Sequence, residues 1–186
     1  MHFSGIVELL NNAALLLALG LIYDTLGFWP RAKKHPKLIG ILTGAFLGLV
    51  GIALMMNSWD FGDGVIFDTR SVILCISGLF FGGIPTVVAM VITSIYRLSL
   101  GGGGALAGIC VIYTSGAIGL GWRHFRSKGQ KNPSISELLL FGIVVHLVML
   151  ACMLLMPWQT AVRIISTVTL PVLTIYPVSY THLTLP

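Results

Sequence analysis

The sequence predicts an all-α, polytopic integral membrane protein: a bundle of about seven transmembrane helices. Only 9% of its 186 residues are Asp, Glu, Lys or Arg, whereas about 25% of a soluble domain is charged. Apolar residues make up 56% of the chain, and they fall into runs close to the roughly 20 residues that a helix needs to cross the hydrocarbon layer. So few charges cannot cover the surface of a soluble fold. The composition therefore argues against a soluble enzyme and against a disulfide-bonded extracellular domain.

The basic residues predict the orientation of the helices. Four of the 11 Lys and Arg residues fall within residues 31–37 and four within residues 123–131, whereas Asp60, Asp63 and Asp68 share a loop without lysine. Short basic loops stay on the cytoplasmic side of the membrane. We therefore expect both basic loops inside and the N-terminus outside. Because the basic clusters act as topology signals, no nucleic-acid partner is expected.

The helices are assigned from apolar runs and from the residues that break them. Ser4–Phe28 has no basic n-region and no small-residue cleavage site, so we expect a retained helix rather than a signal peptide. The stretch Val65–Trp122 is too long for one crossing, and an odd number of crossings must fit between the acidic and the basic loop. Gly82–Pro85 and Gly101–Gly104 interrupt it, because proline lacks the backbone N–H and glycine weakens a helix. The seven predicted helices are Ser4–Phe28, Leu38–Met56, Val65–Gly82, Pro85–Leu100, Ala105–Trp122, Glu137–Met156, and one that runs from Ala161 towards Tyr176.

Asp68, Arg70 and Arg97 form the candidate ligand-binding site. Asp68 and Arg70 lie where the third predicted helix enters from outside, and Arg97 precedes the glycines at the outer end of the fourth. Since these two helices are antiparallel neighbours, the three side chains could meet near the outer mouth. An acid flanked by two arginines would suit an anionic or zwitterionic ligand. Two other interpretations remain: a structural ion pair, or arginines that extend to the lipid headgroups while Asp68 caps the third helix.

The glycines predict close packing rather than phosphate binding. Gly40, Gly44 and Gly48 are spaced four apart, as are Gly78 and Gly82, and small residues at this spacing let helix backbones approach closely. No Gly-Lys-Ser/Thr follows Gly101–Gly104, so these four glycines are not a phosphate loop.

The remaining reactive residue types predict no chemistry. Cys75, Cys110 and Cys152 stand singly in apolar runs without metal-ligand spacing, and we expect them to be inert packing residues. His146 is a lone histidine that we expect in the protein interior. No metal site, cofactor site, paired catalytic carboxylates or Ser/His/Asp constellation is predicted.

Several short motifs occur in a distinctive order along the chain. They are Phe67–Ser71, Gly78–Gly83, Tyr96–Arg97, Gly101–Gly104, Gly119–Arg123, Pro157 and Leu170–Pro177. In this order and spacing the sequence resembles the LytS/YhcK-type five-transmembrane sensor domain of bacterial signalling proteins. Pro85 departs from the pattern, since the resemblance leads us to expect a proline nearer to the two glycines at 82 and 83.

The resemblance implies a membrane input module in the bacterial plasma membrane. The implied parent is a sensor histidine kinase of a phosphorelay, often of the cell-wall-regulating kind, or a diguanylate cyclase. The implied partners are the lipid bilayer, a small-molecule or membrane stimulus, a cytoplasmic output domain missing from this chain, and a second copy in a homodimer. The chain shows no kinase or cyclase motif, so we expect it to receive a signal without catalysing a reaction. The alternative is a substrate-binding membrane subunit of a small-molecule transporter.

The end of the chain is expected to be non-native. Residues 178–186 resemble one reading frame of a transposon adaptor used to prepare sequencing libraries, so we exclude them from fold reasoning. The chain is thus divided into the first helix with its basic loop (1–36), the sensor region with the seventh helix (37–177) and this tail (178–186).

Overall fold

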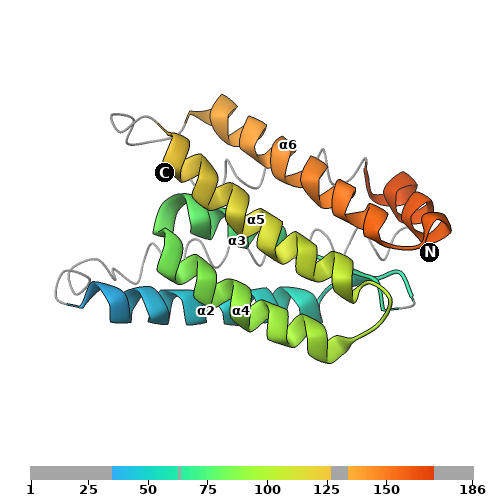
Figure 1. Ribbon diagram of the computed structural model, residues 1–186, viewed down its shortest axis with the longest axis horizontal. Coiled ribbons are helices and arrows are strands. Elements are labelled where there is room, and N and C mark those ends of the chain that lie inside the picture. The colour runs from blue at the N-terminus through green and yellow to red at the C-terminus, as the bar shows by residue number, and fades with distance from the viewer. Residues whose placement is uncertain (1–34, 63, 127–133, 170–186) are drawn as a thin grey trace.

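The chain runs back and forth as antiparallel helices (Figure 1) in the computed structural model, which describes residues 35–62, 64–126 and 134–169. The elements are α2 (Pro36–Met56), β1 (Trp59–Asp60), β2 (Ile66–Phe67), α3 (Arg70–Ile76), the π-helical turn η1 (Ser77–Phe81), α4 (Gly83–Leu100), α5 (Ala105–Phe125), α6 (Ile135–Cys152) and the 3-10 turn η2 (Met153–Leu155). A further helix covers residues 158–169. The first predicted helix (Ser4–Phe28), the end of the seventh and the tail at 178–186 lie outside the described residues.

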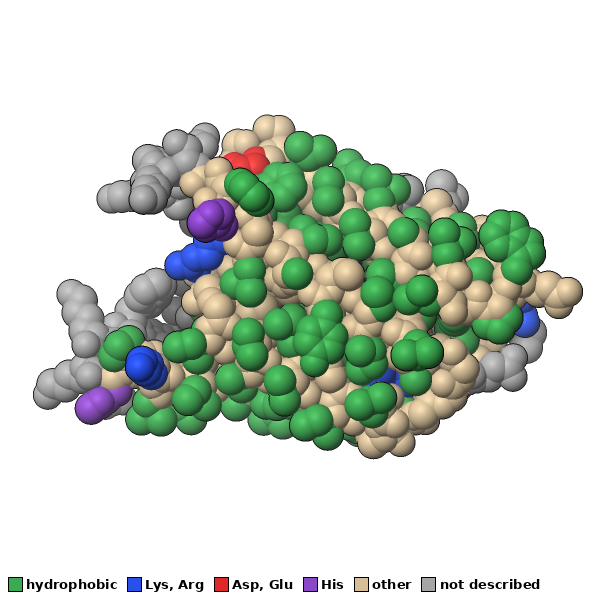
Figure 2. All heavy atoms as spheres, in the orientation of Figure 1, with side chains coloured by type: hydrophobic (Ala, Val, Ile, Leu, Met, Phe, Trp, Pro, Cys, Tyr) green, Lys and Arg blue, Asp and Glu red, His purple; other side chains and the backbone are tan. Residues whose placement is uncertain are grey.

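Four helices are long and apolar enough to cross a membrane. They are α2, α4, α5 and the continuous segment Ile135–Leu155. Large apolar side chains such as Leu49, Ile95 and Leu106 point outward from these helices, and Figure 2 shows hydrophobic side chains spread along the visible face. Lipid is the solvent that such a surface requires. The protein is therefore a polytopic helical membrane protein.

The third predicted helix starts later than the sequence suggests. We predicted it over Val65–Gly82, but Ile66–Phe67 pairs with Trp59–Asp60 as a short antiparallel hairpin and the helix begins at Arg70. Arg70–Phe81 is an apolar helix of 12 residues, which spans roughly 18 Å of a hydrocarbon layer of about 30 Å. An apolar run of this length does not separate strand from helix, which is why the prediction was wrong at this end.

The predicted glycine breaks are confirmed. Gly82 has φ of +88° and separates η1 from α4, while Gly101 and Gly102, with φ of +63° and +82°, end α4 before α5 begins. A side chain is strained in this left-handed region, so glycine is the residue that makes these turns.

The predicted close packing through small residues is also confirmed. α2 packs chiefly along α4, where a Cβ on Gly44 would lie 2.5 Å from the Pro85 carbonyl oxygen and one on Gly48 would lie 2.8 Å from the Ile92 Cβ. A Cβ on Gly78 would lie 2.6 Å from the Leu120 backbone nitrogen on α5. The glycines thus set the separation between neighbouring helices inside one chain.

The two ends of the bundle differ in chemistry. One end carries the β1–β2 hairpin, the glycine loop between α4 and α5, and the start of the helix at 158–169 (Figure 1). Lys, Arg and His side chains gather mainly at the other end, where α2 and α6 begin (Figure 2). There Arg123 donates to the Phe80 carbonyl at 2.8 Å and Arg126 pairs with Glu137 at 2.9 Å. The hairpin end therefore holds the acidic loop, and the opposite end the basic residues.

Candidate functional site

The fold brings the three predicted site residues together at the hairpin end. Asp68 lies between β2 and α3, Arg70 is the first residue of α3, and Arg97 lies in the last turn of α4. Their exposed fractions are only 5%, 5% and 1%. Arg97 lies close enough to interact electrostatically with both Asp68 and Arg70. The three charges thus form one buried cluster.

Asp68 and Arg70 form an ion pair that also starts a helix. The Arg70 Nη1 lies 2.6 Å from the Asp68 Oδ2, and the Arg70 backbone N–H donates to the Asp68 Oδ1 at 2.8 Å. The carboxylate therefore satisfies one of the N–H groups that a helix leaves open at its first turn. The structural ion pair left open by the sequence is therefore present, and the same carboxylate also accepts a backbone N–H at the helix start.

Arg97 ties two loops together. Its Nη1 donates to the Gly101 carbonyl at 2.8 Å and its Nη2 donates to the Gly64 carbonyl at 2.8 Å. One guanidinium thus links the glycine loop to the turn of the β1–β2 hairpin. Because Arg97 is buried and bonded to protein carbonyls, it does not extend to the lipid headgroups.

Gly108 on α5 makes room for both guanidinium groups. A Cβ at this position would lie 2.7 Å from the Arg97 Nε and 3.0 Å from the Arg70 Nη2. The sequence alone does not mark this residue as part of the site. Its signal in the sequence is the spacing of four residues from Gly104, the same spacing that marks the packing glycines of α2.

Four buried polar atoms around the cluster have no hydrogen-bond partner within the described residues. They are the Thr69 Oγ1, the Arg70 Nε, the Ser94 Oγ and the Arg97 Nε. Thr69 lies between the paired Asp68 and Arg70, and Ser94 precedes Arg97 by about one helical turn. Buried polar groups are rarely left without partners. The cluster therefore has donor capacity that the surrounding protein does not use.

The formal charges of the cluster do not cancel. Two arginines face one aspartate, which leaves one positive charge in a buried site. A buried charge without a counter-charge is costly, and guanidinium groups repel a metal cation. In residues 35–62, 64–126 and 134–169, no three His, Cys, Asp or Glu side chains come together as a metal site requires. The arrangement fits an anion rather than a metal.

A cavity of about 250 Å³ lies beside the hairpin. It is lined by Phe61, Gly62, Val65, Gln159, Thr160, Arg163 and Ile164. Val65 directly follows Gly64, whose carbonyl accepts from Arg97. The hairpin thus lines the cavity with Phe61, Gly62 and Val65 and contacts the buried cluster through the Gly64 carbonyl.

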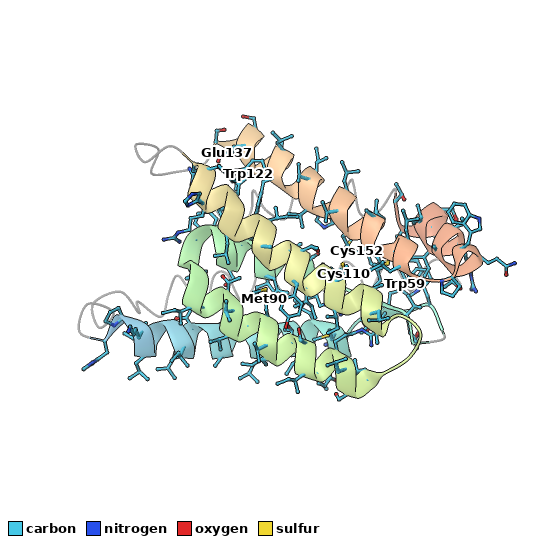
Figure 3. All side chains as sticks on the ribbon, in the orientation of Figure 1. Trp59, Met90, Cys110, Trp122, Glu137 and Cys152 are labelled. Atoms are coloured by element: carbon cyan, nitrogen blue, oxygen red, sulfur yellow. The ribbon has the colours of Figure 1, made fainter. Side chains whose placement is uncertain are left out.

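His146 lies in the protein interior as predicted, whereas two of the cysteines form a contact that the sequence does not predict. His146 is fully buried and its Nδ1 lies 2.7 Å from the Gly142 carbonyl oxygen, which confirms the predicted interior histidine. Cys75 is buried and donates to the Val72 carbonyl at 3.2 Å. Cys110 and Cys152 are separated in the sequence but meet in the fold, with their sulfur atoms 3.3 Å apart (Figure 3).

Comparison with protein families gives one match. The family model described as the 5TMR of 5TMR-LYT covers residues 28–183, most of the chain and all of its described residues. The matched range includes residues 178–183 of the tail expected to be non-native, and that expectation stays a prediction. No curated protein and no solved structure matches significantly.

The family gives the membrane helices a role. Its members are five-transmembrane sensory domains of signalling proteins such as LytS-type kinases. The four helices able to cross a membrane fit such a multi-pass protein, consistent with the bacterial plasma membrane. The chain belongs to the 5TMR-LYT family of membrane sensory domains.

Proposed function

We propose that this domain is the input region of a sensor histidine kinase or a diguanylate cyclase and that it binds a small anionic group at Asp68, Arg70 and Arg97. The observation that carries the site is the excess positive charge of a cluster whose three residues are at most 5% exposed. The family membership supports the sensory role. Regulation of the cell wall is part of the same proposal and rests on the family resemblance.

The unused polar atoms define the chemistry of the ligand. The Nε–H groups of Arg70 and Arg97 can only donate, and the hydroxyls of Thr69 and Ser94 can donate as well. A group that accepts several hydrogen bonds and carries negative charge matches these donors and neutralises the cluster. Carboxylate and phosphate oxygens have these properties, and arginine binds both in planar, paired geometry.

The contacts of Arg97 supply a path for the signal. An anion that competes for this guanidinium changes its hold on the Gly64 and Gly101 carbonyls, and hence the position of the hairpin against the glycine loop. The hairpin residues Val65 and Phe67 belong to the same hydrophobic cluster as Ile164 and Val168 of the helix at 158–169. This seventh helix would carry the change to a cytoplasmic output domain, and the output domains would work as a homodimer.

The predicted topology belongs to the same proposal. Seven helices with the N-terminus outside place the hairpin and the glycine loop on the outer face and Arg123 and Arg126 in the cytoplasm. The grouping of basic side chains at the second end of the bundle supports this orientation. The division into residues 1–36, 37–177 and 178–186 follows from it.

The native reading frame beyond residue 176 tests the sensory role. We expect it to continue into a histidine kinase or diguanylate cyclase domain. A stop codon beside a gene for a transport ATPase would instead support the substrate-binding subunit of a transporter and would contradict the sensor.

Thermal unfolding tests the anion site. The full chain in lipid nanodiscs is compared in sodium phosphate, acetate and chloride at equal ionic strength. We expect a higher Tm in phosphate or acetate, a smaller rise for Ser94→Ala because it removes one donor and leaves the charges in place, and no rise for Arg97→Gln.

Arg163→Gln is the matched control, because Arg163 is an exposed cation that lines the outer cavity and lies outside the cluster. It should keep the full rise in Tm. Equal Tm values of the wild type in all three salts, or a rise lost only in Arg163→Gln, would contradict the proposed site.

A further inference from the structure

We propose that Cys110 and Cys152 are a redox site, in which the two thiols form a reversible intramolecular disulfide when a lipid-soluble quinone oxidises them. This inference is independent of the anion site. It concerns two residues that the sequence predicts to be inert.

The two thiols meet across a helix interface. Cys110 lies on α5 and Cys152 is the last residue of α6, 42 positions later in the chain, and the Cys152 thiol donates to the Cys110 sulfur at 3.3 Å. Figure 3 shows the two side chains between α5 and α6. A disulfide bond is about 2.05 Å long, so the sulfur atoms need to approach by only a little more than 1 Å.

Thr114 places a hydroxyl beside the pair. Its Oγ1 donates to the Cys110 carbonyl at 2.8 Å and lies 3.8 Å from the Cys152 sulfur. This polar neighbour holds the backbone of α5 one turn beyond Cys110. The two thiols are thus kept at one level of the α5–α6 contact.

The third cysteine is too far away to compete. A Cβ on Gly119 of α5 would contact the Cys75 backbone, and Gly119 lies nine positions beyond Cys110, or roughly 14 Å along the helix. Cys75 is also fully buried and bonded to the Val72 carbonyl. The structure therefore singles out one pairing among three thiols.

The position of the pair defines the class of oxidant. Both cysteines lie in helices able to span the membrane, Ala105–Phe125 and Ile135–Leu155, and Cys110 is half-buried. A lipid-soluble oxidant can reach such a position from the membrane. A quinone meets this condition and takes up two electrons. Each thiol gives up its proton, the two sulfur atoms form one bond, and the two electrons and two protons convert the quinone to a quinol.

Disulfide formation would fix α5 against α6 at the end where α6 continues into η2. The hairpin residues Val65 and Phe67 share one hydrophobic cluster with residues of α5, of α6 and of the next helix at residues 158–169. Oxidation would thus restrict relative motion of helices at the end of the protein that carries the hairpin.

The test counts reactive thiols in membranes that contain the full chain. Membranes are treated with decylubiquinone or with dithiothreitol, dissolved in SDS and labelled with a maleimide that adds a large polymer to each thiol. The chain has three cysteines, so we expect three labels after dithiothreitol, one label after the quinone, and three again when the oxidised sample is reduced.

Serine variants assign the bond. Cys75→Ser should change from two labels to none, whereas Cys110→Ser and Cys152→Ser should keep two labels under both conditions. Three labels on the quinone-treated wild type would overturn the proposal. It would also be overturned by a disulfide-linked dimer in place of the intramolecular bond, or by a loss of labels that dithiothreitol does not reverse.

Discussion

Arg97 and Gly108 show how single residues build the candidate site. The guanidinium of Arg97 is 1% exposed and joins two loops through carbonyls at 2.8 Å, which is possible because Gly108 has no side chain where the guanidinium lies. The sequence predicts the three charged residues because each stands at the outer end of a helix. It does not predict Gly108, Thr69, Ser94 or the pairing of Cys110 with Cys152, because these depend on how the helices rotate against one another.

The first prediction concerns Gly108→Ala. The new methyl group would lie 2.7 Å from the Arg97 Nε, so the arginine must move away from its carbonyl acceptors. We expect the free energy of unfolding, measured by SDS titration in micelles, to fall by about 1–3 kcal/mol. Gly121→Ala is the control on the same helix, because nothing lies within 4 Å of its added Cβ. If both variants were as stable as the wild type, Gly108 would not be needed to house the arginines.

At the scale of single helices, the apolar runs predict the bounds of most helices but not the start of α3. α2, α4, α5 and α6 start and end within a few residues of their predicted bounds, because glycine, proline and the polar residues of the loops mark their ends. Residues 65–69 are different: Val65, Ile66 and Phe67 are as apolar as a helix, but Ile66 and Phe67 pair with Trp59–Asp60. Asp68 then starts the helix only at Arg70. Periodicity cannot separate these cases in so short a run.

The second prediction concerns the contact between α2 and α4. A Cβ on Gly44 would meet the Pro85 backbone at 2.5 Å, whereas one on Gly40 would meet the Ile84 side chain at 3.2 Å. A backbone atom cannot yield as a side chain can, so Gly44→Ala should lower the free energy of unfolding by about 1–3 kcal/mol and Gly40→Ala by clearly less. SDS titration measures both. Equal losses would argue against a contact set by Gly44.

The third prediction concerns the contact between α5 and α6 at the basic end. The Glu137 carboxylate accepts from the Trp122 Nε1 at 3.1 Å and pairs with Arg126 at 2.9 Å. Glu137→Gln keeps an acceptor for the tryptophan and should cost less than about 1 kcal/mol in the free energy of unfolding, since the ion pair is partly exposed. Glu137→Leu removes both contacts and should cost more. A Gln variant as unstable as the Leu variant would mean that the charge is the dominant contact.

At the scale of the whole molecule, the distribution of charged residues predicts which end of the bundle faces the cytoplasm and which end faces outside. The acidic hairpin and the basic residues Arg123 and Arg126 at the end of α5 lie at opposite ends of the bundle, as expected if each helix crosses the membrane once. Arg70–Phe81 is too short to do this alone, and the β1–β2 hairpin directly precedes it in the chain. Counting apolar residues does not predict this combination of a short helix with a hairpin before it.

The fourth prediction concerns the orientation. Ser99 is exposed near the glycine loop and His124 is exposed near the basic end. In a variant without native cysteines, Ser99→Cys should react with a membrane-impermeant maleimide in intact cells, whereas His124→Cys should react only after the cells are opened. The opposite labelling pattern would place the hairpin end of the bundle in the cytoplasm and the basic end outside, and would contradict the proposed orientation.

We propose that an anion at Asp68, Arg70 and Arg97 changes how the hairpin and the glycine loop are held. Hydrogen–deuterium exchange of the full chain in nanodiscs tests this most directly, with phosphate and acetate each compared against chloride at equal ionic strength. We predict altered exchange in both segments, residues 59–67 and 98–104, and no such change in Arg97→Gln. Unchanged exchange in the wild type with every anion, or the same response in Arg97→Gln, would contradict the claim.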